Sequence, residues 1–158
     1  MFELMESLAV DAAGGVASGR AEVPIDHPSF TFLADHFVGA PVLPGSLQIE
    51  LCAQIAGPLA EEVTALHHGT ERWAFLGLVR HATFLEPAVL PARLVISAHV
   101  KRAEPSNVAV TASLARANGE TLCRAELVMA LRAADATWAE AIRRYRERVA
   151  AWKARGLR

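Results

Sequence analysis

Residues 35–57 read DHFVGAPVLPGSLQIELCAQIAG and join two segments of opposite character. The part up to Gly45 is rich in proline and glycine, which is typical of an irregular loop. The part after Gly45 is apolar on nearly every side, so it predicts a helix over 46–66 that is buried rather than amphipathic. Pro58 lies inside this helix and, because proline lacks an amide donor, should kink or end the buried segment near Gly57.

One short helix and one strand are predicted before this buried helix, and four strands are predicted after it. Residues 2–10 predict a short helix that Gly14-Gly15 ends, and 16–25 predict a first strand. Four further strands are predicted after the helix, over 73–86, 94–104, 107–117 and 120–132. A sheet that buries one face on a single central helix is an α+β arrangement.

Two short turns connect the last three predicted strands. Asn118-Gly119 predicts a hairpin, because this pair accepts the positive φ values of a type I′ turn. Pro105-Ser106 marks the matching turn one hairpin earlier. The second half of the chain is therefore expected to form an antiparallel meander.

The composition excludes several classes of protein. A chain of 158 residues suits one domain, and 53% apolar with 21% charged residues excludes a disordered chain and leaves apolar surface for a subunit interface. Sixteen basic against 17 acidic residues argue against a nucleic-acid binder. Cys52 and Cys123 lack a CxxC partner and should be buried thiols.

The N-terminus MFELMESLAV carries Glu3 and Glu6 where a signal peptide needs positive charge. In addition, no uninterrupted apolar run is long enough for a membrane span. We therefore expect a soluble cytoplasmic protein with no membrane association.

The C-terminal part predicts a second helix over 136–155. Trp138, Ile142, Tyr145, Val149 and Trp152 recur at helical spacing and form one apolar stripe. Residues 138–158 hold seven basic and two acidic side chains, a net charge of +5. We expect this segment, 136–158, to be an amphipathic addition to a domain over 1–135, with a basic face that is either solvated or docks an acidic partner.

The junction at residues 35–57 carries the residues that suit chemistry. The first amides of a helix have no intrahelical partner, so those near Gly45 suit an oxygen that develops negative charge. Glu50 stands in an apolar helix, where burial favours the neutral carboxyl that a general acid needs. His36 in the loop is a natural proton acceptor, although a lone loop histidine is more often a hydrogen-bonded loop residue.

Gln54 follows Glu50 by four residues and shares its helix face, which indicates a supporting role. The other histidines show no metal-ligand spacing, so no metal is expected. One base, one acid and one helix N-terminus suit the removal of a proton beside a carbonyl and the loss of a β-hydroxyl.

The segment HFVGAPVLPGSLQIELCAQIAG resembles the signature of the bacterial 3-hydroxyacyl-acyl-carrier-protein dehydratases, the FabZ/FabA-type hot-dog enzymes. The positions that fall on the family pattern are His36, Phe37, Gly39, Pro41, Pro44, Gly45, Glu50, Ala53 and Gln54. Residues 75–96, FLGLVRHATFLEPAVLPARLVI, resemble a second family stretch. The similarity covers roughly residues 16–132, and Val38 departs from it where the family has proline.

The resemblance implies a hot-dog fold, with a curved antiparallel sheet around the helix that starts at Gly45. It also implies a dimer in which His36 of one chain, as base, faces Glu50 of the other, as acid. Phe37, Pro44, Gly45 and Gln54 would bind substrate, with the thioester carbonyl on the Gly45 amide. No cofactor is implied, because the substrate arrives on the phosphopantetheine arm of an acyl carrier protein.

The implied reaction yields trans-2-enoyl thioesters in fatty-acid, polyketide or polyene biosynthesis. Two alternatives remain open from the residues. A hot-dog thioesterase would use a carboxylate to activate water. A non-catalytic partner subunit would form a heterodimer with an active hot-dog chain, and Val38 together with the lengthened loop before His36 leaves room for it.

Overall fold

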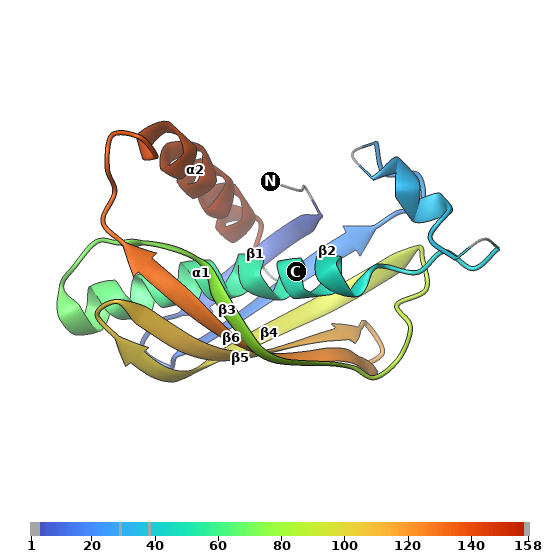
Figure 1. The fold of residues 1–158 in the computed structure, drawn as a ribbon, viewed down its shortest axis with the longest axis horizontal. Coiled ribbons are helices and arrows are strands. Elements are labelled where there is room, and N and C mark those ends of the chain that lie inside the picture. The colour runs from blue at the N-terminus through green and yellow to red at the C-terminus, as the bar shows by residue number, and fades with distance from the viewer. Residues whose placement is uncertain (1–3, 29, 38, 157–158) are drawn as a thin grey trace.

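The computed structural model describes residues 4–28, 30–37 and 39–156, so Val38 lies outside the described residues. One sheet and two α-helices make up most of the chain (Figure 1). In chain order the elements are β1 (Met5–Asp11), β2 (Val16–Val23), the 3₁₀ helix η1 (Thr31–Ala34), α1 (Gly45–His68), β3 (Trp73–Phe84), β4 (Ala92–Glu104), β5 (Asn107–Arg116), β6 (Thr121–Arg132) and α2 (Ala139–Arg155).

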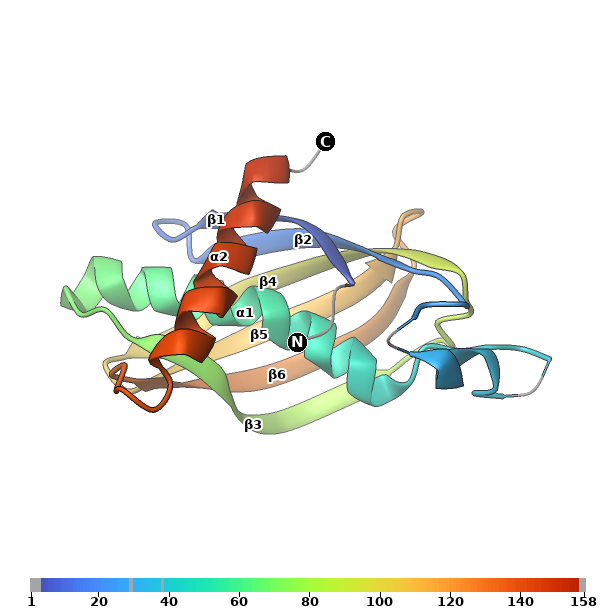
Figure 2. The same ribbon diagram turned by 90° about the horizontal axis from the view of Figure 1, so that it is seen from above.

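The six strands form one antiparallel sheet in the order β1-β2-β4-β5-β6-β3. The sheet curves around α1, which runs along its concave face (Figures 1 and 2). This is the hot-dog arrangement, and it confirms the predicted α+β fold with a central helix and an additional C-terminal helix.

The burial of α1 follows from its apolar sequence. Leu51, Ile55 and Leu59 are fully buried, and so are both cysteines, Cys52 on α1 and Cys123 on β6, as predicted. Strand β2 places small residues against the helix, because Ala17, Gly19 and Ala21 occupy alternate core-facing positions. These small residues allow the helix to approach the sheet closely.

The first predicted element is wrong, because residues 5–11 form a strand instead of a helix. The register pairs Leu8 with Gly19 and Asp11 with Val16, and Gly15, with φ +64°, lies in the turn between the two strands. Pairing with β2 outweighs the helix propensity of Glu, Leu and Met in this segment.

Of the two outcomes predicted for Pro58, a kink or an end of the buried segment, the end is wrong. α1 continues as one helix of 24 residues through Pro58 and ends at Gly69, whose φ of +62° and amide bond to the Ala65 carbonyl make a left-handed cap. Proline costs a helix interior about 3 kcal/mol. The apolar burial on both sides of Pro58 offsets this cost.

Both predicted hairpins are present, but one turn differs from the expected type. Glu104 pairs with Asn107 across Pro105-Ser106, as predicted. In the other hairpin, Gly119 has φ +91° and donates its amide to the Arg116 carbonyl at 2.9 Å, whereas φ of Asn118 is not positive. The turn is therefore not type I′, which needs positive φ at both central residues.

The C-terminal helix α2 crosses the open side of the curved sheet (Figure 2). At its start, the Trp138 ring lies 5.9 Å from that of Trp73 on β3, measured between centroids. At its end, Arg155 donates to the Glu6 carbonyl of β1 at 3.1 Å, and Trp152 is buried. α2 thus contacts both edge strands of the sheet. Within the described ranges, no helix combines the length and apolarity that a membrane span requires.

Replacement of Gly19 by alanine should destabilise the fold by about 1–3 kcal/mol, since overpacking a close contact forces neighbours to move. An ideal Cβ at Gly19 would lie 2.6 Å from Met5 Cε and 2.9 Å from Ile55 Cγ2. Urea unfolding of Gly19→Ala measures this loss, with Ser18→Ala on the same strand as the control. Equal stability of Gly19→Ala and the unmodified protein would contradict the close packing of α1 on β2.

Candidate active site

The loop between β2 and α1 holds His36 in a defined orientation. Its Nδ1 lies 2.9 Å from the Val42 carbonyl oxygen, and its side chain is partly buried. A carbonyl oxygen only accepts hydrogen bonds, so Nδ1 of the neutral ring carries the proton and Nε2 keeps a free lone pair. This arrangement gives the His36 ring a proton-accepting atom at Nε2.

The rest of this loop is attached to the segment before β4. Leu43 donates its amide to the Ala88 carbonyl at 2.9 Å, and Leu90 donates to the Pro41 carbonyl at 2.9 Å. Phe37, beside the His36 ring at 4.9 Å between centroids, is 65% exposed and has φ +64°, a left-handed conformation that is strained for a phenylalanine. Strain of this kind is concentrated at functional sites.

The N-terminus of α1 is placed by Pro44, which precedes the first helical residue, Gly45. A Cβ at Gly45 would lie 2.7 Å from the Phe84 ring, so the glycine is needed for the contact between α1 and the end of β3. The backbone at Gly45 is thus closely approached by a side chain of its own chain. Its amide belongs to the first turn, where amides have no intrahelical partner.

Glu50 lies one and a half turns into α1 and is partly buried, which is less burial than the sequence predicts. Gln54, only 6% exposed, donates from Nε2 to Glu50 Oε1 at 2.9 Å. This bond fixes the carboxyl group and confirms that the two side chains share a helix face.

Glu50 and Gln54 line a cavity of about 310 Å³. Its walls come from α1, β3, β6 and α2, and are formed mostly by apolar side chains, including Trp73, Phe75 and Trp138. This is the size and character of a small-molecule site, with a few polar groups in a largely apolar pocket. The sequence does not reveal that α2 contributes to the cavity, because its apolar stripe predicts only packing on the domain.

The single chain does not bring all the predicted residues to this cavity. Its lining includes Glu50 and Gln54 but not His36, Phe37 or Gly45. The hydrogen bonds of His36 stay within its own loop, and that of Glu50 within α1. The predicted site is therefore divided into two half-sites.

The predicted basic face of α2 is largely ion-paired within the chain. Arg143 and Arg144 both bind Glu140, at 2.8 and 2.7 Å, and Lys153 binds Glu62 of α1 at 2.7 Å. These exposed pairs contribute little to stability. They do reduce the positive potential that an acidic partner would meet.

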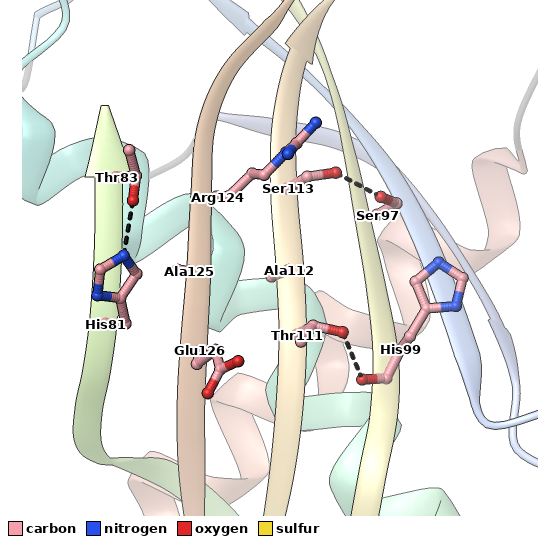
Figure 3. A pocket seen from close by; sticks show the side chains of 10 residues that line it. All are labelled: His81, Thr83, Ser97, His99, Thr111, Ala112, Ser113, Arg124, Ala125 and Glu126. Atoms are coloured by element: carbon pink, nitrogen blue, oxygen red, sulfur yellow. Dashed lines mark hydrogen bonds between the residues drawn. The ribbon is translucent and has the colours of Figure 1, made fainter. Parts of the chain in front are cut away.

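A second hollow, of about 430 Å³, lies on the sheet face opposite α1 (Figure 3). It is polar and open, with a hydrogen bond of 2.8 Å between Ser97 and Ser113 across β4 and β5, and Arg124 above them. None of the predicted site residues lines it. Over the described ranges, no group of three or more His, Cys, Asp or Glu side chains could hold a metal ion.

Comparison with known proteins identifies the family. A family model described as a FabA-like domain matches residues 2–126. The chain is 33% identical over 110 residues to the 3-hydroxyacyl-[acyl-carrier-protein] dehydratase FabZ of Haemophilus influenzae strain PittEE, which covers 70% of each chain. The chain belongs to the FabA-like family of hot-dog dehydratases.

A second curated relative agrees with this placement, and solved structures share the fold. The FabZ of Vibrio atlanticus is 34% identical over 110 residues, or 70% of each chain. A Streptococcus mutans protein bound to acetyl CoA superposes with a TM-score of 0.64 at 16% identity, over 84% of this chain and 91% of that one. The PaaI protein of Escherichia coli superposes with a TM-score of 0.58 at 13% identity, over 75% and 74%. These structural matches support the fold alone.

Glu61 is a further ionisable group on the same helix, close to the cavity. It accepts a hydrogen bond of 2.8 Å from the Ala74 amide of β3, and burial raises its pKa to about 7. Burial also raises the pKa of the Tyr145 hydroxyl well above its ordinary value, and the nearby Glu61 carboxylate adds to this effect. Tyr145 therefore remains a protonated hydroxyl.

Stability should fall as the pH rises from about 4.5 to about 7, because folded Glu61 holds a proton that the unfolded chain releases near 4.5. Glu61→Gln keeps an acceptor for the Ala74 amide but does not titrate, so it should remove about 1–3 kcal/mol of this pH dependence. Urea unfolding at about pH 5 and about pH 7.5 measures the difference.

The exposed Glu71 provides the matched control, as Glu71→Gln. This variant should keep the pH dependence of the unmodified protein. If the free energy of unfolding of Glu61→Gln changed with pH as it does in the unmodified protein, burial of Glu61 would not be the cause of the pH dependence.

Proposed function

We propose that this chain dehydrates 3-hydroxyacyl-acyl-carrier-protein thioesters to trans-2-enoyl thioesters, with His36 as base and Glu50 as acid. The observation that carries the proposal is the Glu50 carboxyl, held by Gln54 beside an apolar cavity in a member of a dehydratase family. Such a cavity suits an acyl chain, and a carboxyl at its edge suits the departing hydroxyl.

The reaction follows from the two side chains. His36 Nε2 takes the proton from C2 of the acyl group, since Nδ1 is already engaged with the Val42 carbonyl. The C2–H electron pair forms the C2=C3 double bond, and the C3–O bond breaks. The Glu50 carboxyl, as the general acid, gives a proton to the leaving oxygen, which departs as water.

The thioester carbonyl gains negative charge while C2 loses its proton. An unpaired amide at the start of α1 can stabilise this oxygen, and Gly45, after Pro44, is the residue assigned to it. Phe37, exposed beside His36, is assigned to the entrance where the phosphopantetheine arm passes. The acyl carrier protein is the proposed partner, and no organic cofactor or metal takes part.

A complete site requires two copies of the chain in this proposal, with His36 of one facing Glu50 of the other. Support comes from β3, an edge strand of the sheet. Five apolar residues on and just after this strand are between 36% and 52% exposed: Phe75, Leu78, Val79, Phe84 and Leu85. An open apolar edge is a ready template for pairing with another chain.

Two substitutions test the assignment of base and acid. His36→Ala and Glu50→Gln should each lower turnover of a 3-hydroxyacyl carrier-protein thioester by at least about 100-fold, because each removes one proton transfer. Mass spectrometry of the carrier-bound product, which has lost one water, measures the turnover. His99→Ala and Glu120→Gln, at exposed positions outside the cavity, are the matched controls.

Each alternative gives a different result in the same assay. Full activity in His36→Ala or Glu50→Gln would contradict the mechanism. Free acid and free thiol as products would identify a thioesterase. Turnover only after addition of a second hot-dog subunit would identify a non-catalytic partner.

A charged substitution on β3 tests whether two copies of the chain pair through this strand. Leu78→Lys places an ammonium group on the exposed edge and should convert a dimer to a monomer, with loss of turnover, because a lysine on an edge strand opposes pairing. Light scattering with size-exclusion chromatography measures the mass. Val95→Lys, at another exposed apolar position on β4, should leave the mass unchanged. A dimeric Leu78→Lys would exclude this edge as the interface.

A further inference from the structure

The cavity beside Glu50 extends along one face of α1. Glu50, Gln54 and Gly57 line it at positions i, i+4 and i+7, which share a face of a helix. At 1.5 Å per residue, Gly57 lies roughly 10 Å further along the helix than Glu50. The cavity therefore reaches well beyond the carboxyl group.

Tyr145 of α2 meets α1 at Gly57. A Cβ at Gly57 would lie 3.1 Å from the Tyr145 hydroxyl oxygen, so the glycine leaves the space that this hydroxyl occupies. Tyr145 and Met129 both line the cavity at this level. The hydroxyl thus lies at the end of the cavity away from Glu50, brought there by the C-terminal helix.

Three buried polar atoms of the lining have no hydrogen-bond partner in the described part of the chain. They are Gln54 Oε1, Trp73 Nε1 and Tyr145 Oη. Buried polar groups in proteins are nearly always paired, and an unpaired one is costly. Three such atoms around one apolar cavity indicate a ligand that brings hydrogen-bonding groups of its own.

The chemistry of these atoms defines the ligand. Trp73 Nε1 only donates, Gln54 Oε1 only accepts, and a tyrosine hydroxyl does both. A purely hydrocarbon chain would leave all three unpaired. A hydroxyl at the end of the chain can bond to Tyr145, while the aromatic rings of Trp73, Phe75 and Trp138 line the path of the carbon atoms before it.

We propose that the cavity selects acyl chains that carry a hydroxyl at their far end, and that Tyr145 recognises this group. The inference rests on the proposed function, because it takes the cavity beside Glu50 as the acyl site. The C-terminal segment is then a specificity element, since Trp138, just before α2, lies at the wall and Tyr145 of α2 lies at the end.

A pair of S-alkyl pantetheines of equal chain length tests this selection without any reaction. One ends in a methyl group and the other in a hydroxyl, and calorimetry gives Kd for each at several chain lengths. The hydroxylated ligand should bind about tenfold tighter at the matching length, the effect of one good hydrogen bond. Equal or weaker binding of the hydroxylated ligand at every length would overturn the proposal.

Two variants test whether Tyr145 causes the difference in Kd between the two ligands. Tyr145→Phe keeps the ring and should lower the tenfold ratio to about one. Gly57→Ala should also lower the ratio of the two Kd values to about one, because its new Cβ contacts the Tyr145 hydroxyl oxygen. This variant replaces Tyr145→Phe in the test if Tyr145→Phe does not fold. Thr137→Val removes a hydroxyl from an exposed residue just before α2 and should keep the ratio. An unchanged ratio in both Tyr145→Phe and Gly57→Ala would exclude Tyr145 as the recognising group.

Failure of this inference differs from failure of the proposed function. Selective binding without dehydration of any carrier-bound substrate would retain the hydroxyl site and refute the dehydratase. Dehydration without selective binding would retain the dehydratase and refute the hydroxyl site.

Discussion

The burial of α1 within the curved sheet is the interaction on which the rest of the structure depends. The helix is apolar on nearly all sides and extends for 24 residues, so the sheet has to bend around it and leave small residues such as Gly19 in contact with it. One stripe of the same helix, from Glu50 to Gly57, faces the cavity instead. The element that holds the core together therefore also carries the acid of the proposed reaction, and its position is fixed by packing rather than by a loop.

Much of the fold could be predicted because local and tertiary preferences agree there. The apolar segment after Gly45 predicts α1 within two residues at each end, and the runs after Trp73 predict four strands. Gly119 specifies its hairpin because positive φ is needed there, even though Asn118 does not share it. The loop with His36 and the helix with Glu50 were recognisable because the motif is continuous in sequence.

Other features depend on contacts between distant segments. Residues 5–11 carry helix-forming side chains, and only the pairing with β2 makes them a strand. Pro58 is tolerated because packing outweighs a lost hydrogen bond, which its neighbours in sequence do not reveal. The cavity needs Gly57 and Tyr145 to meet across 88 residues of chain, so no local pattern predicts it. The assignment of His36 opposite Glu50 stays a prediction, because it concerns two chains.

The position of α2 across the sheet has a consequence for assembly. The helix packs on β1 and its Arg155 occupies a carbonyl of that edge strand, whereas the edge at β3 keeps exposed apolar side chains. A sheet with two open edges can add copies without limit and form filaments, but one with a single open edge is complete once that edge is paired. In the proposed dimer paired through β3, the contact of the C-terminal helix with β1 would oppose the addition of a further strand at that second edge.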